Sequence, residues 1–375
     1  MAKIGIDCRI YSTKFTGIGR YTYELTRRLF YLDNKNHYVL FFNNPQYHEY
    51  IPPSHNVKKV LVNAAHYSFA EQTRFLRLLL KEKLDLMHFA HFNAPIFYFR
   101  PSIVTIHDLI ISFFPGKKYS PFKRLAYHFV INSAVRKAKK VIAVSENTKS
   151  DIIRHLHVNP EKIEVIYEGI GEEFQKTHNK EIINLTLEKY GIHKPFLLYT
   201  GVHRGHKNLL GLIKAFKILL DKYGDRWQLV ITGKHDPHYP EIYSAASQPE
   251  LQQNIIFTDI VPEEDLVNLY SAAALYVHPS FYEGFGFCPL EAMACGTPVA
   301  VSRVSSLPEI CGKENAAFFD PHDATDMAQQ IHKALIDENL RKKLIKNGLE
   351  RAKDFDWNEV AAKTLELYNK TLDKI

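Results

Sequence analysis

A regular alternation of short β-rich runs with helical patterns limits the fold of this chain more than any other feature. Runs of four to six residues, rich in Val, Ile, Leu, Phe and Tyr, are separated by stretches long enough to hold a helix. This rhythm predicts parallel strands joined by crossover helices, because parallel strands cannot be joined by a tight turn. The expected strands form two series: 3–8, 38–42, 59–62, 84–89, 102–107, 140–144 and 162–167, then 195–200, 227–232, 254–257, 274–278, 297–302 and 316–319.

With 375 residues, the chain exceeds the usual size of one hydrophobic core and fits two domains. We expect two doubly wound α/β domains, residues 1–175 and 190–356, facing each other across a cleft. The segment from Gly169 to about Lys194 is the expected link. Residues 357–375 have the pattern of an amphipathic C-terminal helix, and the sequence does not indicate where this helix docks.

One connecting segment carries a capping-box pattern, formed by Ser68 and Glu71. It predicts a helix in which each of these two residues bonds to the backbone of the other. The apolar side chains expected on the buried face of this helix are Phe75, Leu76, Leu79 and Leu80.

Cysteine usage and hydropathy predict a cytoplasmic protein. The four cysteines show neither a C-x-x-C pair nor the spacing of a zinc site; they are Cys8, Cys288, Cys295 and Cys311. The apolar run at the start is too short for a signal peptide, and no later stretch reaches the roughly 18–20 apolar residues that cross a bilayer. We therefore expect that the chain is neither exported nor membrane-spanning.

Positive charge is concentrated in the first half of the chain. Residues 1–180 contain 27 Lys and Arg against 15 Asp and Glu, a net charge of +12, whereas residues 181–375 carry −5. The asymmetry suggests an acidic partner, either anionic lipid headgroups or an acidic glycan. Nucleic acid is a competing interpretation, and a solvated lysine-rich surface is another.

A basic stretch interleaved with apolar side chains would allow peripheral contact with the inner face of the cytoplasmic membrane. The apolar residues are Phe122, Leu125, Tyr127, Phe129 and Val130. Partial packing of the same helix into the core is the alternative. The basic residues are Lys117, Lys118, Lys123, Arg124, Arg136, Lys137, Lys139 and Lys140.

The strongest chemical signal is the string FYEGFGFCPLEAMACGTP at residues 281–298. It is typical of a strand end, a glycine loop, a short helix and the next strand. Pro289 must lie in the first helical turn, and Gly296 is suited to end the helix, so the helix is expected to begin near Phe287. Backbone N–H groups at that end would suit an anion such as a diphosphate.

Two glutamates accompany this expected phosphate site. Glu283 lies in the loop and Glu291 about one turn inside the helix, while Gly284 and Gly286 permit a close approach by a ligand. Carboxylates at these places could accept hydrogen bonds from sugar hydroxyls. In the alternative interpretation, Glu283 merely caps the helix and Glu291 is solvated.

Glu283 and Glu291, with seven residues between them, resemble the E-x7-E signature of retaining glycosyltransferases of family 4, which have the GT-B fold of two Rossmann-like domains. The resemblance implies that Glu283 contacts hydroxyls of the donor sugar, that Glu291 holds the ribose of the nucleotide, and that Phe285, Gly286 and Phe287 supply backbone between them. Further matches to the family are TGIGRYTYEL (16–25), TIHDL (105–109), VSENTKSDI (144–152), HKNLLGLIKAF (206–216), SLPEICG (306–312) and FFDPHD (318–323).

The loop after the strand at 195–200 offers positive charge for the leaving diphosphate. Gly201 is followed by Arg204 and Lys207, our candidates for offsetting the charge that develops on the β-phosphate. Solvated surface charges are the alternative. His203 and His206 have no third ligand in this stretch, so we expect no metal and no cofactor besides the nucleotide-sugar substrate.

The first domain contributes weaker candidates. Gly17 and Gly19 precede the helical pattern RYTYELTRRL and could approach phosphate or acceptor, but Thr22 departs from a dinucleotide fingerprint, which disfavours a nicotinamide cofactor. His107 and Asp108 end an expected strand. The resemblance places His107 beside the reacting sugar, whereas a lone histidine is otherwise more often structural. Asp108 is expected to orient its loop.

Together these features predict a metal-independent hexosyltransferase, and the resemblance implies that it retains anomeric configuration. The family likeness favours mannose from GDP-mannose, transferred to a glycan or lipid-linked glycan in surface polysaccharide or lipopolysaccharide synthesis. A sugar-nucleotide epimerase or hydrolase on the same fold is the enzymatic alternative. A basic nucleic-acid-binding protein is the non-enzymatic one.

Overall fold

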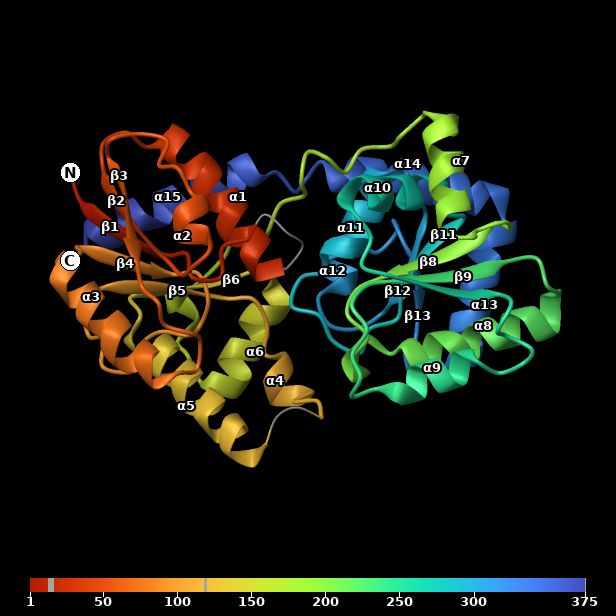
Figure 1. The fold of residues 1–375 in the computed structure, drawn as a ribbon, viewed down its shortest axis with the longest axis horizontal. Helices are drawn as coiled ribbons and strands as arrows, with labels where there is room; N and C mark the ends of the chain where they lie inside the picture. Colours follow the sequence, from red (N-terminus) through yellow and green to blue (C-terminus); the bar gives the residue numbers. More distant parts are fainter. Residues whose placement is uncertain (13–16, 118–119, 375) are drawn as a thin grey trace. The chain divides into compact units, whose positions relative to one another are not determined.

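The computed structural model describes residues 1–12, 17–117 and 120–374 and divides the chain into two compact units. Unit 1 comprises Met1–Phe113, Tyr119–Gly169 and Asp356–Ile375, and unit 2 comprises Phe114–Lys118 and Ile170–Phe355. Each unit is a parallel sheet with helices on both faces (Figure 1). The predicted fold class, two doubly wound α/β domains, is therefore confirmed.

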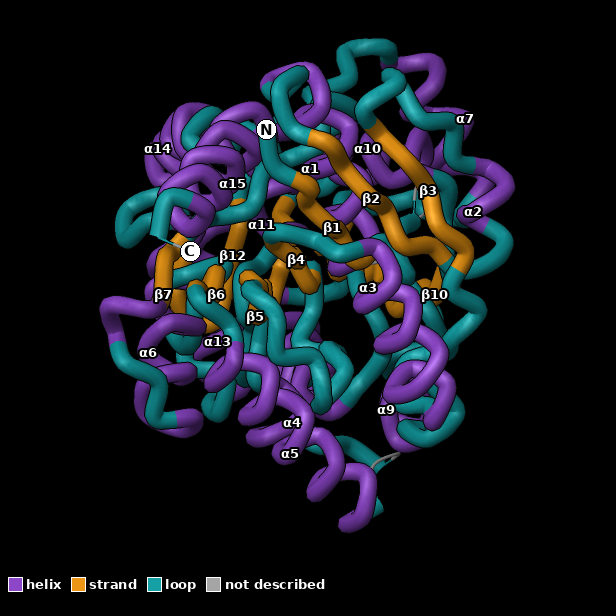
Figure 2. The backbone as a smooth tube through the Cα atoms, turned by 90° about the vertical axis from the view of Figure 1, so that its left-hand side faces the viewer, coloured by secondary structure: helices purple, strands orange, loops and turns teal. Residues whose placement is uncertain are grey.

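The sheet of unit 1 has seven parallel strands in the order β3-β2-β1-β4-β5-β6-β7. Its strands run side by side in Figure 2, and all seven expected runs form them. Their bounds are β1 (Lys3–Asp7), β2 (His37–Phe42), β3 (Val57–Leu61), β4 (Leu86–Phe89), β5 (Ser102–Ile106), β6 (Lys140–Ala143) and β7 (Ile163–Val165).

The helices of unit 1 cover a core that contains Phe41, Phe75 and Ile106. Their bounds are α1 (Gly17–Leu32), α2 (Gln46–Glu49), the π-helical turn η1 (Glu71–Phe75), α3 (Leu76–Glu82), α4 (Ile110–Phe113), α5 (Pro121–Lys137), α6 (Glu146–Leu156), the 3-10 turn η2 (Pro160–Lys162) and α15 (Trp357–Leu372). None of the described helices is both long enough and apolar enough to cross a bilayer.

Unit 2 repeats the plan with six parallel strands in the order β10-β9-β8-β11-β12-β13, again as expected. The strands are β8 (Phe196–Thr200), β9 (Gln228–Thr232), β10 (Ile255–Asp259), β11 (Leu275–His278), β12 (Val299–Ser302) and β13 (Ala317–Phe319). The helices are α7 (Lys180–Lys189), the 3-10 turn η3 (Gly205–Lys207), α8 (Leu209–Tyr223), α9 (Pro240–Ala246), α10 (Glu263–Ala272), α11 (Phe287–Ala294), α12 (Leu307–Cys311), α13 (Ala324–Ile336) and α14 (Glu338–Ala352).

The C-terminal helix α15 returns to unit 1 and packs along α1 (Figure 1). The ring of Trp357 lies 6.0 Å from that of Tyr21, and the Tyr368 hydroxyl is 2.6 Å from Nδ1 of the buried His88. A Cβ on Gly169 would lie 2.6 Å from Trp357, so only glycine fits beneath the indole without movement. The docking site that the sequence left open is thus on the first unit.

The capping-box prediction was half wrong. The Glu71 backbone N–H does donate to Ser68 Oγ at 3.3 Å. The Glu71 carboxylate, however, does not return to Ser68; it accepts from Tyr67 N at 3.0 Å and from the buried Arg9 at 2.8 Å. A buried guanidinium needs a partner, and this need outweighs the local cap. Leu80, expected on the buried face, is exposed.

Candidate functional site

The loop between β11 and α11 has the geometry that the sequence predicted. Helix α11 begins at Phe287, Pro289 lies in its first turn, and Gly296 follows its end with φ of +73°. The residue before the helix is Gly286, with φ of +114°, a backbone conformation that glycine adopts without strain. Gly286 has no side chain that could cap the helix, so at this position only backbone atoms lie at the start of α11.

Glu283 is the centre of a buried polar cluster. Its Oε1 atom lies 2.6 Å from Lys207 Nζ, 2.8 Å from His278 Nε2 and 2.6 Å from Ser280 Oγ, which donates to it. Burial alone would raise the Glu283 pKa, but the Lys207 ammonium and the hydrogen bond from His278 hold it well below its usual value. Glu283 is therefore an ionised acceptor and does not cap the helix, contrary to the alternative interpretation.

Two serines beyond β12 fix the backbone of this loop. Ser305 Oγ donates to the Glu283 carbonyl at 2.5 Å, and Ser306 Oγ donates to the carbonyls of Glu283 and Phe285 at 3.0 and 2.7 Å. Sequence reasoning missed these serines, together with His278 and Ser280. His278 ends a predicted strand, and the three serines follow predicted strands at the carboxyl edge of a parallel sheet, where such sheets bind ligands. Ser306 also begins the family-like stretch SLPEICG.

Glu291 is also buried, so the prediction that it could be merely solvated is wrong. Its Oε2 atom accepts a hydrogen bond from the Tyr270 hydroxyl of α10 at 3.0 Å. Both glutamates are only 7% exposed, and they lie before and within the same short helix. The side chain of Phe285 packs against Phe287 and Phe355, leaving backbone between the two carboxylates.

The loop after β8 brings one of its two candidate cations to Glu283. Gly201 has φ of +141°, and a Cβ on the facing Gly233 would collide with the Gly201 carbonyl, so two backbones meet closely here. Lys207 ends the turn η3 and is 14% exposed beside Glu283. Arg204 is 48% exposed, and its nearest acidic group is Asp236 at 3.6 Å. The structure therefore places Lys207, and not Arg204, in the buried cluster.

The two histidines of this loop are buried. His203 bonds to the Tyr243 hydroxyl, and burial together with the Lys207 charge lowers the His206 pKa to about 4. Within the described ranges, no group of three or more His, Cys, Asp or Glu is placed to hold a metal ion. The expectation that the chain has no D-x-D triplet, which would have counted against a metal, is wrong, because residues 354–356 are Asp-Phe-Asp. Both carboxylates have local partners: Asp354 pairs with Arg351, and Asp356 caps α15.

In unit 1, His107 follows β5 and has both ring nitrogens engaged. Nδ1 lies 2.9 Å from Glu168 Oε1, and Nε2 lies 2.9 Å from the Ala90 carbonyl. Burial opposes a charge on His107, but the hydrogen bond and negative charge of Glu168 outweigh it and raise the His107 pKa. Asp108 accepts from Ile110 N at 2.9 Å and so orients its loop, as expected.

The remaining candidates of unit 1 are Gly17 and Gly19. They form the first turn of α1, which begins three residues earlier than the sequence pattern predicted. Residues 13–16 lie outside the described residues. They include Thr16, the first residue of the family-like stretch TGIGRYTYEL. Gly19 is buried and Gly17 is exposed.

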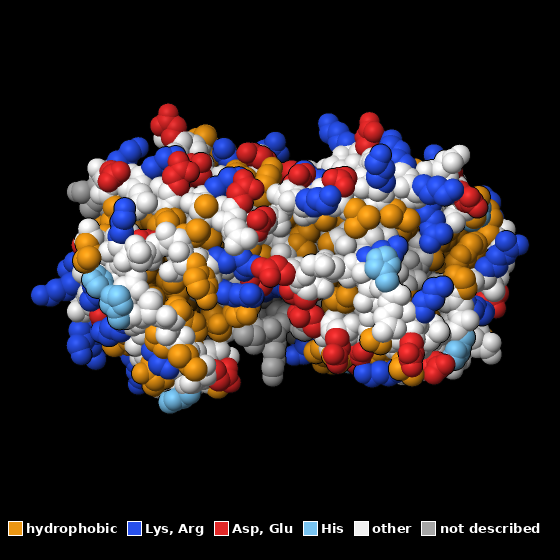
Figure 3. Space-filling view, turned by 90° about the horizontal axis from the view of Figure 1, so that it is seen from above, with side chains coloured by type: hydrophobic (Ala, Val, Ile, Leu, Met, Phe, Trp, Pro, Cys, Tyr) orange, Lys and Arg blue, Asp and Glu red, His pale blue; other side chains and the backbone are white. Residues whose placement is uncertain are grey.

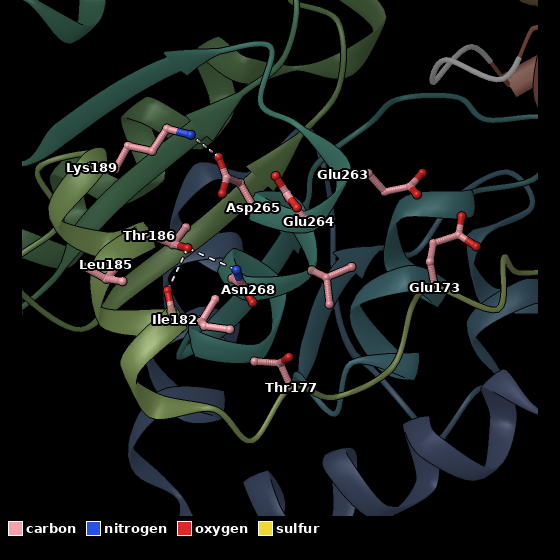
Figure 4. Close-up of a pocket in the computed structure, with 11 residues that line it drawn as sticks. Glu173, Thr177, Ile182, Leu185, Thr186, Lys189, Glu263, Glu264, Asp265 and Asn268 are labelled. Atoms are coloured by element: carbon pink, nitrogen blue, oxygen red, sulfur yellow. Dashed lines mark hydrogen bonds and ion pairs between the residues drawn. The ribbon is translucent and has the colours of Figure 1, made fainter.

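A pocket of about 630 Å³ lies between α7 and α10 (Figure 4). None of the predicted site residues lines it. Its wall carries the carboxylates of Glu173, Glu263, Glu264 and Asp265, against a single lysine, Lys189, which pairs with Asp265 at 2.6 Å. Such a wall repels a diphosphate, so the loop around Glu283 is the better candidate site.

Comparison with known proteins agrees with this assignment. The model of Glycosyltransferase Family 4 matches residues 15–174, and that of Glycosyl transferases group 1 matches residues 186–351. Over 373 residues, the chain is 30% identical to O-antigen chain mannosyltransferase B of Escherichia coli, covering 94% of this chain and 96% of the relative. It is 31% identical to the E. coli serotype-specific mannosyltransferase WbdA over 63% of this chain, spanning 29% of that longer protein.

Among solved structures, sucrose-phosphate synthase from Thermosynechococcus elongatus superimposes with a TM-score of 0.81 at 20% identity, with both chains fully covered. This likeness shows the fold, two Rossmann-like domains of GT-B type. The family models, the full-length relative and the buried Glu283 and Glu291 agree in identifying an enzyme that transfers sugars. The chain belongs to glycosyltransferase family 4, whose members are retaining glycosyltransferases.

Proposed function

We propose that this glycosyltransferase transfers mannose from GDP-mannose to a glycan or lipid-linked glycan in the synthesis of a surface polysaccharide. The observation that carries the proposal is the 30% identity, over nearly the whole of both chains, with an O-antigen chain mannosyltransferase. A second relative, from Salmonella typhimurium, is also named as an O-antigen chain mannosyltransferase and is 29% identical over 66% of this chain.

In the proposed reaction, the diphosphate of the donor lies at the amino-terminal end of α11, with Lys207 and Arg204 offsetting its charge. The bond between the anomeric carbon and the β-phosphate oxygen breaks, and the acceptor oxygen bonds to that carbon on the same face. The acceptor proton passes to the departing phosphate. Because these protein cations are available, we propose that catalysis needs no metal, which activity in the presence of EDTA would test.

Within this scheme, Glu283 accepts hydrogen bonds from hydroxyls of the donor sugar and Glu291 from the ribose. The depressed pKa of Glu283 suits this role, because an ionised carboxylate only accepts. Lys207 would contact both Glu283 and the diphosphate, which places the sugar and the phosphate in a fixed relation. His107, from unit 1, is proposed to lie beside the reacting sugar.

The donor is tested by two measurements. Thermal shift with GDP, UDP and ADP should rank GDP first, since a ligand at 100 times its dissociation constant adds about 2.7 kcal/mol of stability. Incubation with GDP-mannose and an oligosaccharide acceptor should give a mannosylated product with retained configuration. Release of free mannose or an epimerised nucleotide-sugar as the main product, with or without acceptor, would overturn the proposal.

We also propose that the enzyme works in the cytoplasm, with α5 of unit 1 resting on the anionic inner face of the membrane. Phe122, Leu125 and Phe129 are 84%, 69% and 62% exposed and share one face of α5, beside Lys123 and Arg124. On the same helix, Tyr127, Val130 and Ile131 are buried, so the helix also packs into the core, as the alternative expected.

Lys118, which belongs to the basic stretch, lies outside the described residues, and the one face drawn in Figure 3 carries charge of both signs. In the view from above, basic and acidic side chains alternate over both units (Figure 3). Sedimentation with phosphatidylglycerol vesicles should exceed that with phosphatidylcholine vesicles, and the double variant F122S/F129S should reduce it. The double variant I51S/F69S removes two exposed apolar side chains of unit 1 that lie outside α5 and is the matched control. Equal binding by both double variants would contradict docking through α5.

A further inference from the structure

A continuous run of buried hydrogen bonds leaves Glu283 in the direction of Glu291. Its first link joins Glu283 Oε1 to His278 Nε2 at 2.8 Å, and the second joins His278 Nδ1 to the Tyr276 hydroxyl at 2.9 Å. The third joins the Tyr276 hydroxyl to Thr200 Oγ1 at 3.2 Å. The run therefore crosses from β11 to the neighbouring strand β8.

The run continues from β8 to α10 and ends at the second glutamate. Thr200 Oγ1 lies 2.9 Å from the Tyr270 hydroxyl, and this hydroxyl donates to Glu291 Oε2 at 3.0 Å. We call the four intermediate residues, His278, Tyr276, Thr200 and Tyr270, the polar bridge. All four are at most 4% exposed, so water does not compete for their contacts.

The protons of the polar bridge can be counted for the state in which both glutamates are ionised. Burial lowers the His278 pKa, so the imidazole is neutral; it donates from Nε2 to Glu283 and accepts at Nδ1 from Tyr276. At the other end, Tyr270 donates to Glu291 and accepts from Thr200. No proton then remains for the contact between Tyr276 and Thr200, which is the longest of the five links.

Two runs of donors, one directed at each glutamate, thus meet at Tyr276 and Thr200. If the group at position 283 donated to His278 Nε2 instead of accepting from it, the ring proton would lie on Nδ1 and be donated to Tyr276, which would free the Tyr276 proton for Thr200. The hydrogen bond that Thr200 donates to Tyr270 then becomes stronger, because hydrogen bonds in a buried chain polarise one another. The effect ends on Glu291.

We propose that the polar bridge couples the two glutamates, so that the sugar end and the nucleotide end of the donor are recognised together. Tyr276 and Thr200 are positioning residues in this scheme: they touch no substrate and act through His278 and Tyr270. The proposal rests on the donor-binding function proposed above. Its consequence is that a donor with the wrong sugar also loses affinity at its nucleotide end.

The test is a double-mutant cycle read as the Kd of a nucleoside diphosphate, measured by calorimetry with whichever of GDP, UDP and ADP binds tightest. This ligand carries the ribose but lacks the donor sugar, so Glu283 has no donor-sugar hydroxyl to contact. We expect E283Q to change the Kd about fivefold in the wild-type background, within the range of couplings between groups in one network. In the Y276F background, which cuts the polar bridge, the same substitution should change the Kd by less than about twofold, because only the contact of Glu283 with Lys207 remains.

Two further variants keep the test decisive. Y199F removes a buried hydroxyl from the strand of Thr200 without cutting the polar bridge, so E283Q should still act about fivefold in it. T200V removes the same link, between Tyr276 and Thr200. It takes the place of Y276F in the test if Y276F does not fold. An E283Q effect that stays near fivefold in the Y276F or T200V background shows that all of it runs through Lys207, and it overturns the coupling. So does the absence of any effect in the wild type.

Failure of the proposed function has a different signature. If none of the three nucleotides binds, or if E291A leaves their binding unchanged, the donor site itself is wrong and the coupling proposal falls with it. If a nucleotide binds in a manner that depends on Glu291, while the cycle shows no coupling, only the polar bridge is wrong.

Discussion

Each unit buries a histidine–glutamate pair, and the two pairs hold their protons in opposite ways. His278 and Glu283 of unit 2 are 2.8 Å apart, and His107 and Glu168 of unit 1 are 2.9 Å apart. Both pKa values are lowered in the pair of unit 2, whereas both are raised in the pair of unit 1. The separation of the partners therefore does not decide their charge.

The third group beside each pair makes the difference. In unit 2 burial lowers the His278 pKa, and the Lys207 ammonium adds to this effect while it stabilises the Glu283 carboxylate. In unit 1 the other nitrogen of His107 faces the Ala90 carbonyl, an acceptor, and this favours a proton on both nitrogens. Burial meanwhile raises the Glu168 pKa. The Lys207 ammonium thus keeps Glu283 ionised, so that this carboxylate accepts hydrogen bonds. The Ala90 carbonyl favours the protonated form of His107.

The largest expected effect comes from K207M, which removes the cation that distinguishes the two pairs. We expect kcat to fall by about 10²–10³-fold, because one preorganised group that stabilises developing charge is lost. The Glu283 pKa should rise at the same time, because the Lys207 charge no longer helps the hydrogen bond from His278 to oppose burial. Steady-state transfer assays measure the first effect. K207R keeps the charge and should retain more activity than K207M; a fall below tenfold in K207M would contradict the role of Lys207.

E291A tests the other end of the site. The Kd of the nucleoside diphosphate should rise about tenfold, the effect of losing one hydrogen bond to a charged group. Isothermal calorimetry measures it. E314A is the control, since Glu314 is an exposed glutamate of unit 2 paired with Lys343, and its Kd should match the wild type. Equal Kd values for E291A and the wild type would show that Glu291 does not contact the nucleotide.

The pair of unit 1 predicts a pH dependence of stability. A raised pKa in the folded state means that the folded protein binds the proton more tightly, so the stability from His107 is present below its unfolded pKa near 6.5 and is lost as pH rises above it. The raised pKa of Glu168 acts in the same direction from about 4.5 upward.

E168Q removes both shifts. The difference in melting temperature between the wild type and E168Q should therefore shrink as pH rises from about 5 to 9, by a few degrees in total. Thermal melts at intervals of one pH unit measure it. A difference that widens with pH would show that His107 is not protonated against Glu168. The pair of unit 2 has the opposite sign, since stability from a lowered pKa is lost as pH falls.

The smallest effect is expected from R204A. The guanidinium is half exposed and 3.6 Å from Asp236, so solvent and salt screen it. We expect kcat/KM to fall about threefold at low salt, and less at about 0.5 M salt, in line with the small worth of exposed charges. A loss as large as that of K207M would place Arg204 beside the reacting phosphate and would end the distinction between the two cations.

Local sequence rules were sufficient for the elements and for the shape of the donor loop. The thirteen strands follow from β-rich runs, and the start of α11 at Phe287 follows from the limits on Pro289 and Gly296. Glu283 and Glu291 could be singled out from their spacing around that helix. These features depend on residues close together in the chain, which is why one sequence suffices to predict them.

The contacts of the site could not be predicted, because they join residues far apart in the chain. Lys207 meets Glu283 across 76 positions, and Tyr270 and Thr200 are 70 apart. Glu168 carried no signal at all: its pairing with His107 depends on how β5 and the end of unit 1 are placed in the sheet. The misassigned Glu71 has the same cause, since Arg9 lies 62 positions away.

The return of α15 to unit 1 has a consequence for biosynthesis. The ribosome delivers β1 to β7 first, then all of Ile170–Phe355, and only then the helix that covers α1 and supplies Tyr368 to His88. At ordinary elongation rates this interval lasts roughly ten seconds or more. Throughout it, the nascent first unit must keep an apolar face unprotected, so it is the unit more in need of a chaperone while translation continues.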